Sequence, residues 1–200
     1  MAGPEAALIT GVFGSGKSTV LAEAADLLEV GGLPFAAIDI DWLGWAVTAD
    51  DVAGEDASGA DPEAGGVGDS LPRPHPALSK LTLENLAMVV ANDRRHGIER
   101  FLLAHAIWHV DEVTMLRTAL DMPLRVVGLS TPLLVIQARL RGDPTRGRLD
   151  DLARTESWLA DGAKAVPVDL TLDNTRPVAE VGRELIDWLG WRPTASPSPK

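Results

Sequence analysis

Short apolar runs alternate along the chain with segments that carry an apolar residue at every third or fourth position. The apolar runs predict strands at 6–10, 34–41, 100–108, 124–130 and 168–173. The segments with helical spacing predict helices at 19–28, 78–96, 111–120, 133–140, 149–159 and 178–188. Strands that alternate with helices in this way indicate an α/β domain with a parallel, five-stranded sheet covered by helices on both faces.

Two segments depart from this alternation. From about 49 to 76 the chain is rich in Gly, Asp, Ala and Pro without periodicity, and the tail at 193–200 is rich in Pro and Ser. We therefore expect a single domain over residues 1–192 with a flexible insertion at about 49–76, followed by a disordered tail. A loop that covers substrate and becomes ordered on binding is the alternative for the insertion.

The charge balance narrows the range of partners. Lys and Arg number 18 against 29 Asp and Glu, which gives a net charge of -11. Such a chain neutralises phosphates poorly, so we expect no nucleic acid and no membrane as a partner. The absence of cysteine excludes disulfides, thiolate zinc sites and cysteine nucleophiles. No signal-peptide pattern or membrane-length apolar run is present, which favours a cytoplasmic location; the oligomeric state is not indicated.

The strongest chemical signal stands between the first predicted strand and helix. Gly11-Val12-Phe13-Gly14-Ser15-Gly16-Lys17-Ser18 fits G-x-x-x-x-G-K-S/T, the P-loop that holds nucleotide phosphates. Its glycines let backbone N–H groups surround the phosphates, and the helix start adds positive charge. We expect Lys17 to reach the β- and γ-phosphates of ATP and Ser18 to bind Mg²⁺. The expected nucleotide contacts here are Gly11, Phe13, Gly14, Ser15, Gly16, Lys17, Ser18 and Thr19.

Two acids, Asp39 and Asp41, end the second predicted strand. The carboxyl ends of parallel strands meet at one edge of a sheet, so both acids should lie on the P-loop edge. Their spacing places them on one face of an extended segment. A turn or a helix cap is the ordinary alternative for either residue. The third predicted strand ends in no acid, and a guanine-reading N-K-x-D signature is absent, which favours small-molecule kinases over GTPases and motor ATPases.

Histidines and tryptophans gather near the same edge. His105 and His109 have the spacing of helical metal ligands, but they follow a strand, which favours His105 in the wall of an acceptor pocket. Two uses are open for Trp42, Trp45 and Trp108, namely packing in the core or pocket wall and stacking on a planar substrate.

These features occur together in a known group of enzymes. The P-loop, the Asp-x-Asp after strand two, the arginine-rich segment 139–148 and the Asp-Asn-Thr turn at 173–175 resemble the small P-loop kinases. That group includes the shikimate, gluconate and adenylylsulfate kinases and the chloramphenicol phosphotransferases. Residues 36–43 and 85–92 look most like adenylylsulfate-kinase-like ATP-binding proteins of bacteria. The resemblance covers nearly the whole chain apart from the insertion and tail, and it implies a three-layer, nucleotide-kinase-like fold with a helical lid.

The resemblance also implies roles for the two acids. Asp41 would orient and deprotonate the acceptor hydroxyl, and Asp39 would hold Mg²⁺ through water. In chloramphenicol phosphotransferases the acid that matches Asp39 is the base, so the two roles can be exchanged. The Asp-Gly-Asp-Asn sequence that follows strand two in adenylylsulfate kinases is missing, which argues against adenylylsulfate as the acceptor.

Arginines and a turn complete the implied site. Arg146 and Arg148 match lid arginines that fold over the transferring phosphate, and Arg139 and Arg141 stand at the lid's entrance. A solvated surface is the ordinary alternative for each arginine. The adenine-contacting turn of the family falls at Asn174, Thr175 and Arg176.

We interpret the chain as an ATP-dependent kinase that transfers the γ-phosphate to a hydroxyl of a small metabolite. Two alternatives stay open. A nucleotide or nucleoside kinase would need a basic acceptor site, for which Arg73, His75, Arg94 and Arg95 are the candidates. A nucleotide-binding regulatory protein would lack transferase activity altogether. The sequence does not identify the acceptor.

Overall fold

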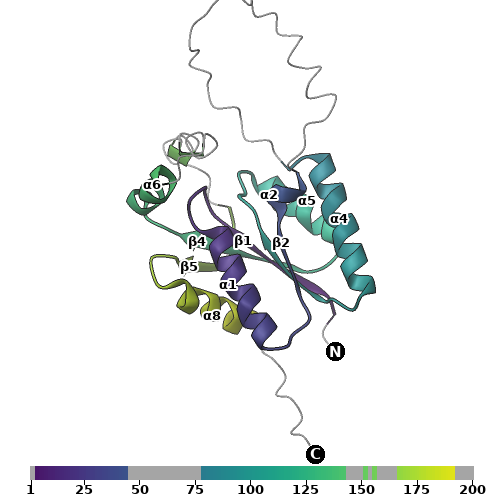
Figure 1. Ribbon diagram of the computed structural model, residues 1–200. Coiled ribbons are helices and arrows are strands. Elements are labelled where there is room, and N and C mark those ends of the chain that lie inside the picture. The colour runs from purple at the N-terminus through teal and green to yellow at the C-terminus, as the bar shows by residue number, and fades with distance from the viewer. Residues whose placement is uncertain (1–2, 45–77, 143–150, 153–154, 157–165, 192–200) are drawn as a thin grey trace, which may run out of the picture.

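A parallel sheet forms the centre of the computed structural model, which describes residues 3–44, 78–142, 151–152, 155–156 and 166–191 (Figure 1). Over this part of the chain the sheet has five strands in the order β2-β3-β1-β4-β5. The strands are β1 (Glu5–Thr10), β2 (Ala36–Asp39), β3 (Arg100–Ala104), β4 (Leu124–Ser130) and β5 (Leu170–Asp173). All four pairings are parallel, so the predicted sheet is confirmed.

Helices cover both faces of the sheet, as predicted. They are α1 (Lys17–Val30), α2 (Ile40–Leu43), α4 (Lys80–Arg95), α5 (Val110–Leu120), α6 (Leu133–Arg141) and α8 (Val178–Leu189). Helices α1 and α8 pack together on one face, and α4 and α5 on the other (Figure 1). None of the helices described is long and apolar enough to cross a membrane. The insertion at 49–76, the tail and most of the expected lid lie outside the described residues.

The central strand β1 is buried on both faces of the sheet, which agrees with its continuous apolar run. Ala7 and Ile9 of β1 belong to the core under α1 and α8, whereas Ala6 and Leu8 belong to the core under α4 and α5. All four are completely buried. A strand that is buried on both faces needs apolar residues at every position, which is why it appears as a continuous apolar run.

The second strand ends earlier than predicted. Asp39 is its last residue, and the fully buried Ile40 begins the short helix α2. The Asp39 carboxylate accepts a hydrogen bond from the Asp41 backbone N–H at 3.2 Å, which caps that helix. The prediction that Asp39 and Asp41 share one face of an extended segment is therefore wrong, although the helix cap still brings them together.

The third strand also stops before its predicted end. It ends at Ala104 instead of Trp108 because the following backbone bonds to side chains. Thr10 Oγ1 accepts the Ile107 N–H at 3.1 Å, and the buried Glu112 carboxylate accepts the Trp108 N–H at 2.7 Å. Glu112 also accepts the N–H of His109, so this carboxylate caps α5. The fifth strand is also shorter than predicted, because it starts at Leu170 and not at Val168.

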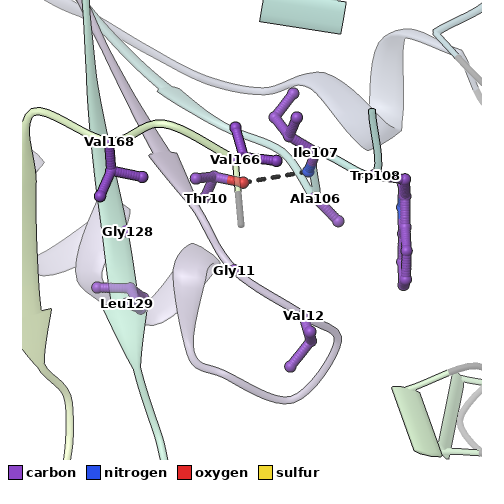
Figure 2. A pocket seen from close by; sticks show the side chains of 10 residues that line it. All are labelled: Thr10, Gly11, Val12, Ala106, Ile107, Trp108, Gly128, Leu129, Val166 and Val168. Carbon is purple, nitrogen blue, oxygen red and sulfur yellow. Dashed lines mark hydrogen bonds between the residues drawn. The ribbon is translucent and has the colours of Figure 1, made fainter. Parts of the chain in front are cut away.

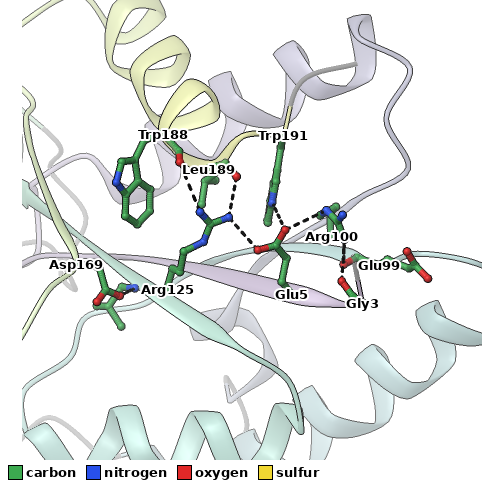
Figure 3. A network of polar contacts seen from close by, with 10 residues as sticks. Gly3, Glu5, Glu99, Arg100, Arg125, Asp169, Trp188, Leu189 and Trp191 are labelled. Carbon is green, nitrogen blue, oxygen red and sulfur yellow. Dashed lines mark hydrogen bonds and ion pairs between the residues drawn. The ribbon is translucent and has the colours of Figure 1, made fainter. Parts of the chain in front are cut away.

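A polar network joins the amino ends of the strands to the last helix (Figure 3). Glu5 accepts hydrogen bonds from the Trp191 indole at 2.8 Å and from Arg125 at 2.9 Å, and pairs with Arg100 at 3.3 Å. Arg125 also donates to the carbonyl of Leu189, at the end of α8. One carboxylate thus connects β1, β3, β4 and α8 at the end of the sheet opposite the P-loop.

We expect Glu5→Ala to lower the free energy of unfolding by about 1–3 kcal/mol, because two partly buried arginines lose their carboxylate. Thermal unfolding measures this change. The exposed Glu29→Ala on α1 is the matched control and should stay within about 0.5 kcal/mol of the parent. Affinity for an ATP analogue should be unchanged, since the network lies far from the P-loop; a Glu5→Ala variant as stable as the parent would contradict this role.

Candidate nucleotide and acceptor site

The P-loop leaves β1 after Thr10 and enters α1 at Lys17, two residues before the predicted helix start. Gly11, Gly14 and Gly16 each combine a positive φ with the close approach of other atoms, and the first and last show why glycine is needed. Gly11 has φ 154°, and a Cβ there would lie 2.7 Å from Ser15 Oγ. Gly16 has φ 98°, and a Cβ there would collide with the Asn174 side-chain amide. The loop can take this shape only with glycine at both positions.

The outer side of the P-loop is held by three other elements. The Ser15 carbonyl accepts hydrogen bonds from Asn174 Nδ2 at 2.6 Å and from Thr131 Oγ1 at 3.1 Å. It also accepts one from Arg139 at 3.1 Å, and the same guanidinium group donates to the Gly14 carbonyl. The ends of β4 and β5 and the helix α6 therefore all position this loop.

The P-loop lysine is largely buried, with 7% of its surface exposed. The Lys17 ammonium donates to the Val12 carbonyl at 3.3 Å and lies 5.3 Å from the centre of the Phe13 ring. The Phe13 ring packs in turn against Trp108, with ring centres 5.6 Å apart. These contacts keep the positive charge inside the loop, where the motif requires it to meet phosphates.

Ser18 and Asp39 meet at the start of α1. The Ser18 hydroxyl donates to Asp39 Oδ2 at 2.7 Å, although the two residues come from different elements of the fold. Hydroxyl and carboxylate oxygens are the ligands that Mg²⁺ prefers, so this pair fits the metal that the P-loop implies. Asp39 also caps α2. The helix-capping alternative is therefore observed for Asp39, and the same carboxylate is the one expected to hold Mg²⁺.

Asp41 points toward a different partner. Its Oδ1 lies 2.6 Å from Nδ1 of His105, which is almost fully buried at the exit of β3, whereas 40% of the Asp41 side chain is exposed. Within the described residues, no three His, Asp or Glu side chains gather as metal ligands. The structure thus places His105 against the candidate base.

The turn after β5 is organised by Asp173. Hydrogen bonds from the hydroxyl and backbone N–H of Thr175 lower the pKa of the Asp173 carboxyl below its usual value. Arg176 turns toward α8, where its guanidinium group donates a 2.6 Å hydrogen bond to the Glu184 carboxylate, which raises the pKa of Arg176. Of the three residues expected to contact adenine, Asn174 alone is shown bonded to the P-loop.

Some expected residues are not placed, and others were missed. Arg146 and Arg148 lie outside the described residues, and Arg141 is exposed at the end of α6. The sequence did not identify Thr131 as a P-loop contact or the bond between Asp41 and His105. The sequence signal that could have identified these contacts is position, because both Thr131 and His105 directly follow the carboxyl end of a strand.

A cavity of about 120 Å³ lies beside the P-loop (Figure 2). Its wall comes from four parts of the chain, namely Thr10–Val12, Ala106–Trp108, Gly128–Leu129, and Val166 with Val168. Among these described residues, the side chains other than Thr10 are apolar or, for Trp108, aromatic. Its position at the carboxyl ends of β1, β3 and β4 is where ligands bind in parallel sheets.

We expect Asn174→Ala to weaken the binding of the ATP analogue AMPPNP by about tenfold, because the buried Ser15 carbonyl loses its shortest hydrogen bond. Calorimetric titration with AMPPNP and with tripolyphosphate measures the effect. Equal losses for both ligands indicate support of the P-loop, whereas a loss confined to AMPPNP indicates a contact with the base and would contradict the structural role. Thr171→Ala, exposed on β5, is the control.

No protein-family model matches the chain, and no curated protein matches it in sequence. Solved structures match it in fold. An unliganded sugar kinase from a Janibacter species is 20% identical, with a TM-score of 0.60 over 95% of this chain and 96% of the other. A gluconokinase from Sinorhizobium meliloti is 19% identical, with a TM-score of 0.54 over 95% and 94%. The APS kinase of Mycobacterium tuberculosis, in complex with AMPPNP and APS, is 22% identical, with a TM-score of 0.52 over 95% and 99%.

These similarities cover nearly the whole of each chain, but identities near 20% establish the fold and not the substrate. The strand order, the P-loop between β1 and α1 and the helices on both faces agree with them. The protein shares the nucleotide-kinase-like fold of these three structures.

Proposed function

We propose that this protein is an ATP-dependent kinase that transfers the γ-phosphate to a hydroxyl group of a small metabolite. The observation that carries the proposal is the pair of acids beside the P-loop. Asp39 bonds to the P-loop Ser18 at 2.7 Å, while Asp41 lies 2.6 Å from His105. Two adjacent carboxylates with different partners suit the two tasks of metal binding and proton acceptance. The fold shared with a sugar kinase and a gluconokinase supports the same reaction class.

The nucleotide side of the site rests on the P-loop. Its backbone N–H groups and Lys17 would hold the phosphates of ATP, with Ser18 and Asp39 holding Mg²⁺. Bound Mg²⁺ would neutralise phosphate charge as it redistributes during transfer. The full set that we assign to the nucleotide is Gly11, Phe13, Gly14, Ser15, Gly16, Lys17, Ser18, Thr19, Arg139, Asn174, Thr175 and Arg176.

Asp41 is the proposed base. The acceptor hydroxyl gives its proton to the Asp41 carboxylate as its oxygen forms a bond to the γ-phosphorus. The bond between the γ-phosphorus and the bridging oxygen breaks, and ADP leaves with that oxygen. His105 holds one carboxylate oxygen through its contact with Oδ1, which fixes the orientation of the group. Arg146 and Arg148 are proposed to close over the transferring phosphate from the lid.

The position of two basic residues bears on the nucleotide-kinase alternative. Helix α4 meets the acceptor side near its start, where the Asn85 amide donates to the Leu43 carbonyl at 2.9 Å. Arg94 and Arg95 lie at the other end of this helix, about 14 Å further along its axis. They are therefore badly placed to bind an acceptor phosphate beside Asp41. The other two candidates for a basic acceptor site, Arg73 and His75, lie outside the described residues.

Hydroxyl-dependent release of ADP tests the proposed function. Metabolites are first screened for thermal stabilisation of the protein in the presence of AMPPNP and Mg²⁺, and those that bind are assayed with ATP. We expect at least one hydroxyl compound to stimulate ADP formation, and Lys17→Ala to reduce the rate about 10²–10³-fold through loss of transition-state charge stabilisation. Lys80→Ala, exposed on α4, is the control. Tight nucleotide binding without any stimulating acceptor would favour the regulatory alternative.

Substitution of each acid by its amide separates the two roles. Asp41→Asn should lower kcat about 10²–10⁴-fold and leave the Mg²⁺ requirement unchanged, because it removes only the proton acceptor. Asp39→Asn should raise the Mg²⁺ concentration for half-maximal rate by about tenfold or more. Steady-state kinetics at varied Mg²⁺ measure both effects. The reverse pattern would show that the two acids have exchanged roles.

A further inference from the structure

The cavity beside the P-loop has a wall that water would solvate poorly. Among the described residues that line it, the polar side-chain groups are the Thr10 hydroxyl and the Trp108 indole N–H, and the Thr10 oxygen already accepts the Ile107 N–H at 3.1 Å. In Figure 2, Leu129 and Val168 lie on one side of the space and the Trp108 ring on the other. The Val168 side chain remains 37% exposed, although it is apolar. Such a wall suits an apolar group better than an ordered water, which needs two to four polar partners.

Two glycines line the cavity, Gly11 at the start of the P-loop and Gly128 on the adjoining strand β4. A Cβ added at Gly128 would stand 3.1 Å from the Val168 side chain, so glycine at this position leaves room on that side of the cavity. At about 120 Å³ the cavity is slightly smaller than an engineered cavity of about 150 Å³ in another protein that binds benzene. It therefore has room for a branched alkyl group or for most of a six-membered ring.

The cavity adjoins both halves of the candidate site. Gly11 and Val12 belong to the loop that would hold the phosphates, and Trp108 packs against Phe13 of the same loop. On the other side, Ala106 directly follows His105, which contacts Asp41; successive Cα atoms are about 3.8 Å apart. A molecule in this cavity would thus lie against the loop and within one residue of the partner of the proposed base.

We propose that this cavity binds an aliphatic or aromatic group of the acceptor, so that the substrate is an alcohol with an apolar body and not a uniformly polar polyol. The inference rests on the proposed function, since it names the class of acceptor for the same site. The apolar group occupies the cavity, and the hydroxyl group extends toward Asp41 and the γ-phosphate. Apolar burial here orients the acceptor without any charged contact.

Binding of a simple alcohol tests the inference without any phosphate transfer. Benzyl alcohol is titrated into ¹⁵N-labelled protein saturated with AMPPNP and Mg²⁺, and ethylene glycol is the polar control. We expect benzyl alcohol to cause saturable chemical-shift changes at the backbone amides of Ala106 and Gly128, and ethylene glycol to cause none. Among unbranched alcohols from ethanol to butanol, each added methylene should tighten binding about fourfold. Shifts that are not saturable, or that fall on other surfaces, would overturn the inference.

Two variants change the volume of the cavity in opposite directions. Ala106→Leu fills it and should weaken benzyl alcohol binding more than tenfold, whereas Ala119→Leu, half-buried on α5 and away from the cavity, should not. Val168→Ala enlarges it at a position tolerant of truncation because it is partly exposed. This variant should keep benzyl alcohol binding and gain binding of 2-naphthylmethanol. If it gains none, the inference is overturned even where Ala106→Leu does not fold.

The outcomes separate this inference from the proposed function. If benzyl alcohol binds as expected but no alcohol is phosphorylated, the apolar site stands and the kinase assignment fails. If a polar acceptor is phosphorylated with a KM that Ala106→Leu leaves within twofold of the parent, and no alcohol binds at the cavity, the kinase assignment stands and the apolar subsite is wrong.

Discussion

The backbone carbonyl of Ser15 is the point on which the site depends. A loop that turns its N–H groups toward phosphates leaves carbonyls on its outer side, and buried carbonyls need donors. Here Asn174, Thr131 and Arg139 supply them from β5, the end of β4 and α6. Because these donors come from three elements, the P-loop has its shape only when the sheet is assembled. The short motif is specified locally, but its geometry is a property of the whole fold.

The two acids show how one short turn can give neighbouring carboxylates different partners. If β2 continued as a strand through Asp41, both carboxylates would face the same way. Because Ile40 is buried and α2 begins there, Asp39 stays with Ser18 while Asp41 reaches His105, just after the end of the neighbouring strand β3. Like charges placed side by side would disfavour each other, and separate hydrogen-bonding partners reduce that cost. The cap on α2 therefore both begins this helix and directs the two carboxylates to different partners.

The sheet, its helices and the P-loop could be predicted because each is encoded in local periodicity or in a contiguous motif. The ends of β2 and β3 could not, since they depend on side chains that bond to backbone N–H groups, and such bonds leave no periodic pattern. Asp39 accepts the Asp41 N–H, Glu112 accepts the Trp108 N–H, and Thr10 accepts the N–H of Ile107, 97 residues away. The same holds for the site. Lys17 and Ser18 follow from spacing, whereas the role of Asn174 in positioning the P-loop needs two segments more than 150 residues apart. The cavity combines four segments, and no local pattern marks it.

The apolar surroundings of Lys17 bear on how the proposed kinase would avoid hydrolysing ATP. Water competes with the acceptor hydroxyl for the γ-phosphate, so the space beside it must be filled by substrate or protein. Phe13 and Trp108 form a packed aromatic wall beside the P-loop lysine, whose ammonium lies 5.3 Å from the centre of the Phe13 ring. Low polarity near the ammonium strengthens its attraction to phosphate, because the effective dielectric constant falls. An acceptor with an apolar body would extend that wall, whereas a polyol would bring its own water. The aromatic wall therefore favours an acceptor with an apolar body, as proposed for the cavity.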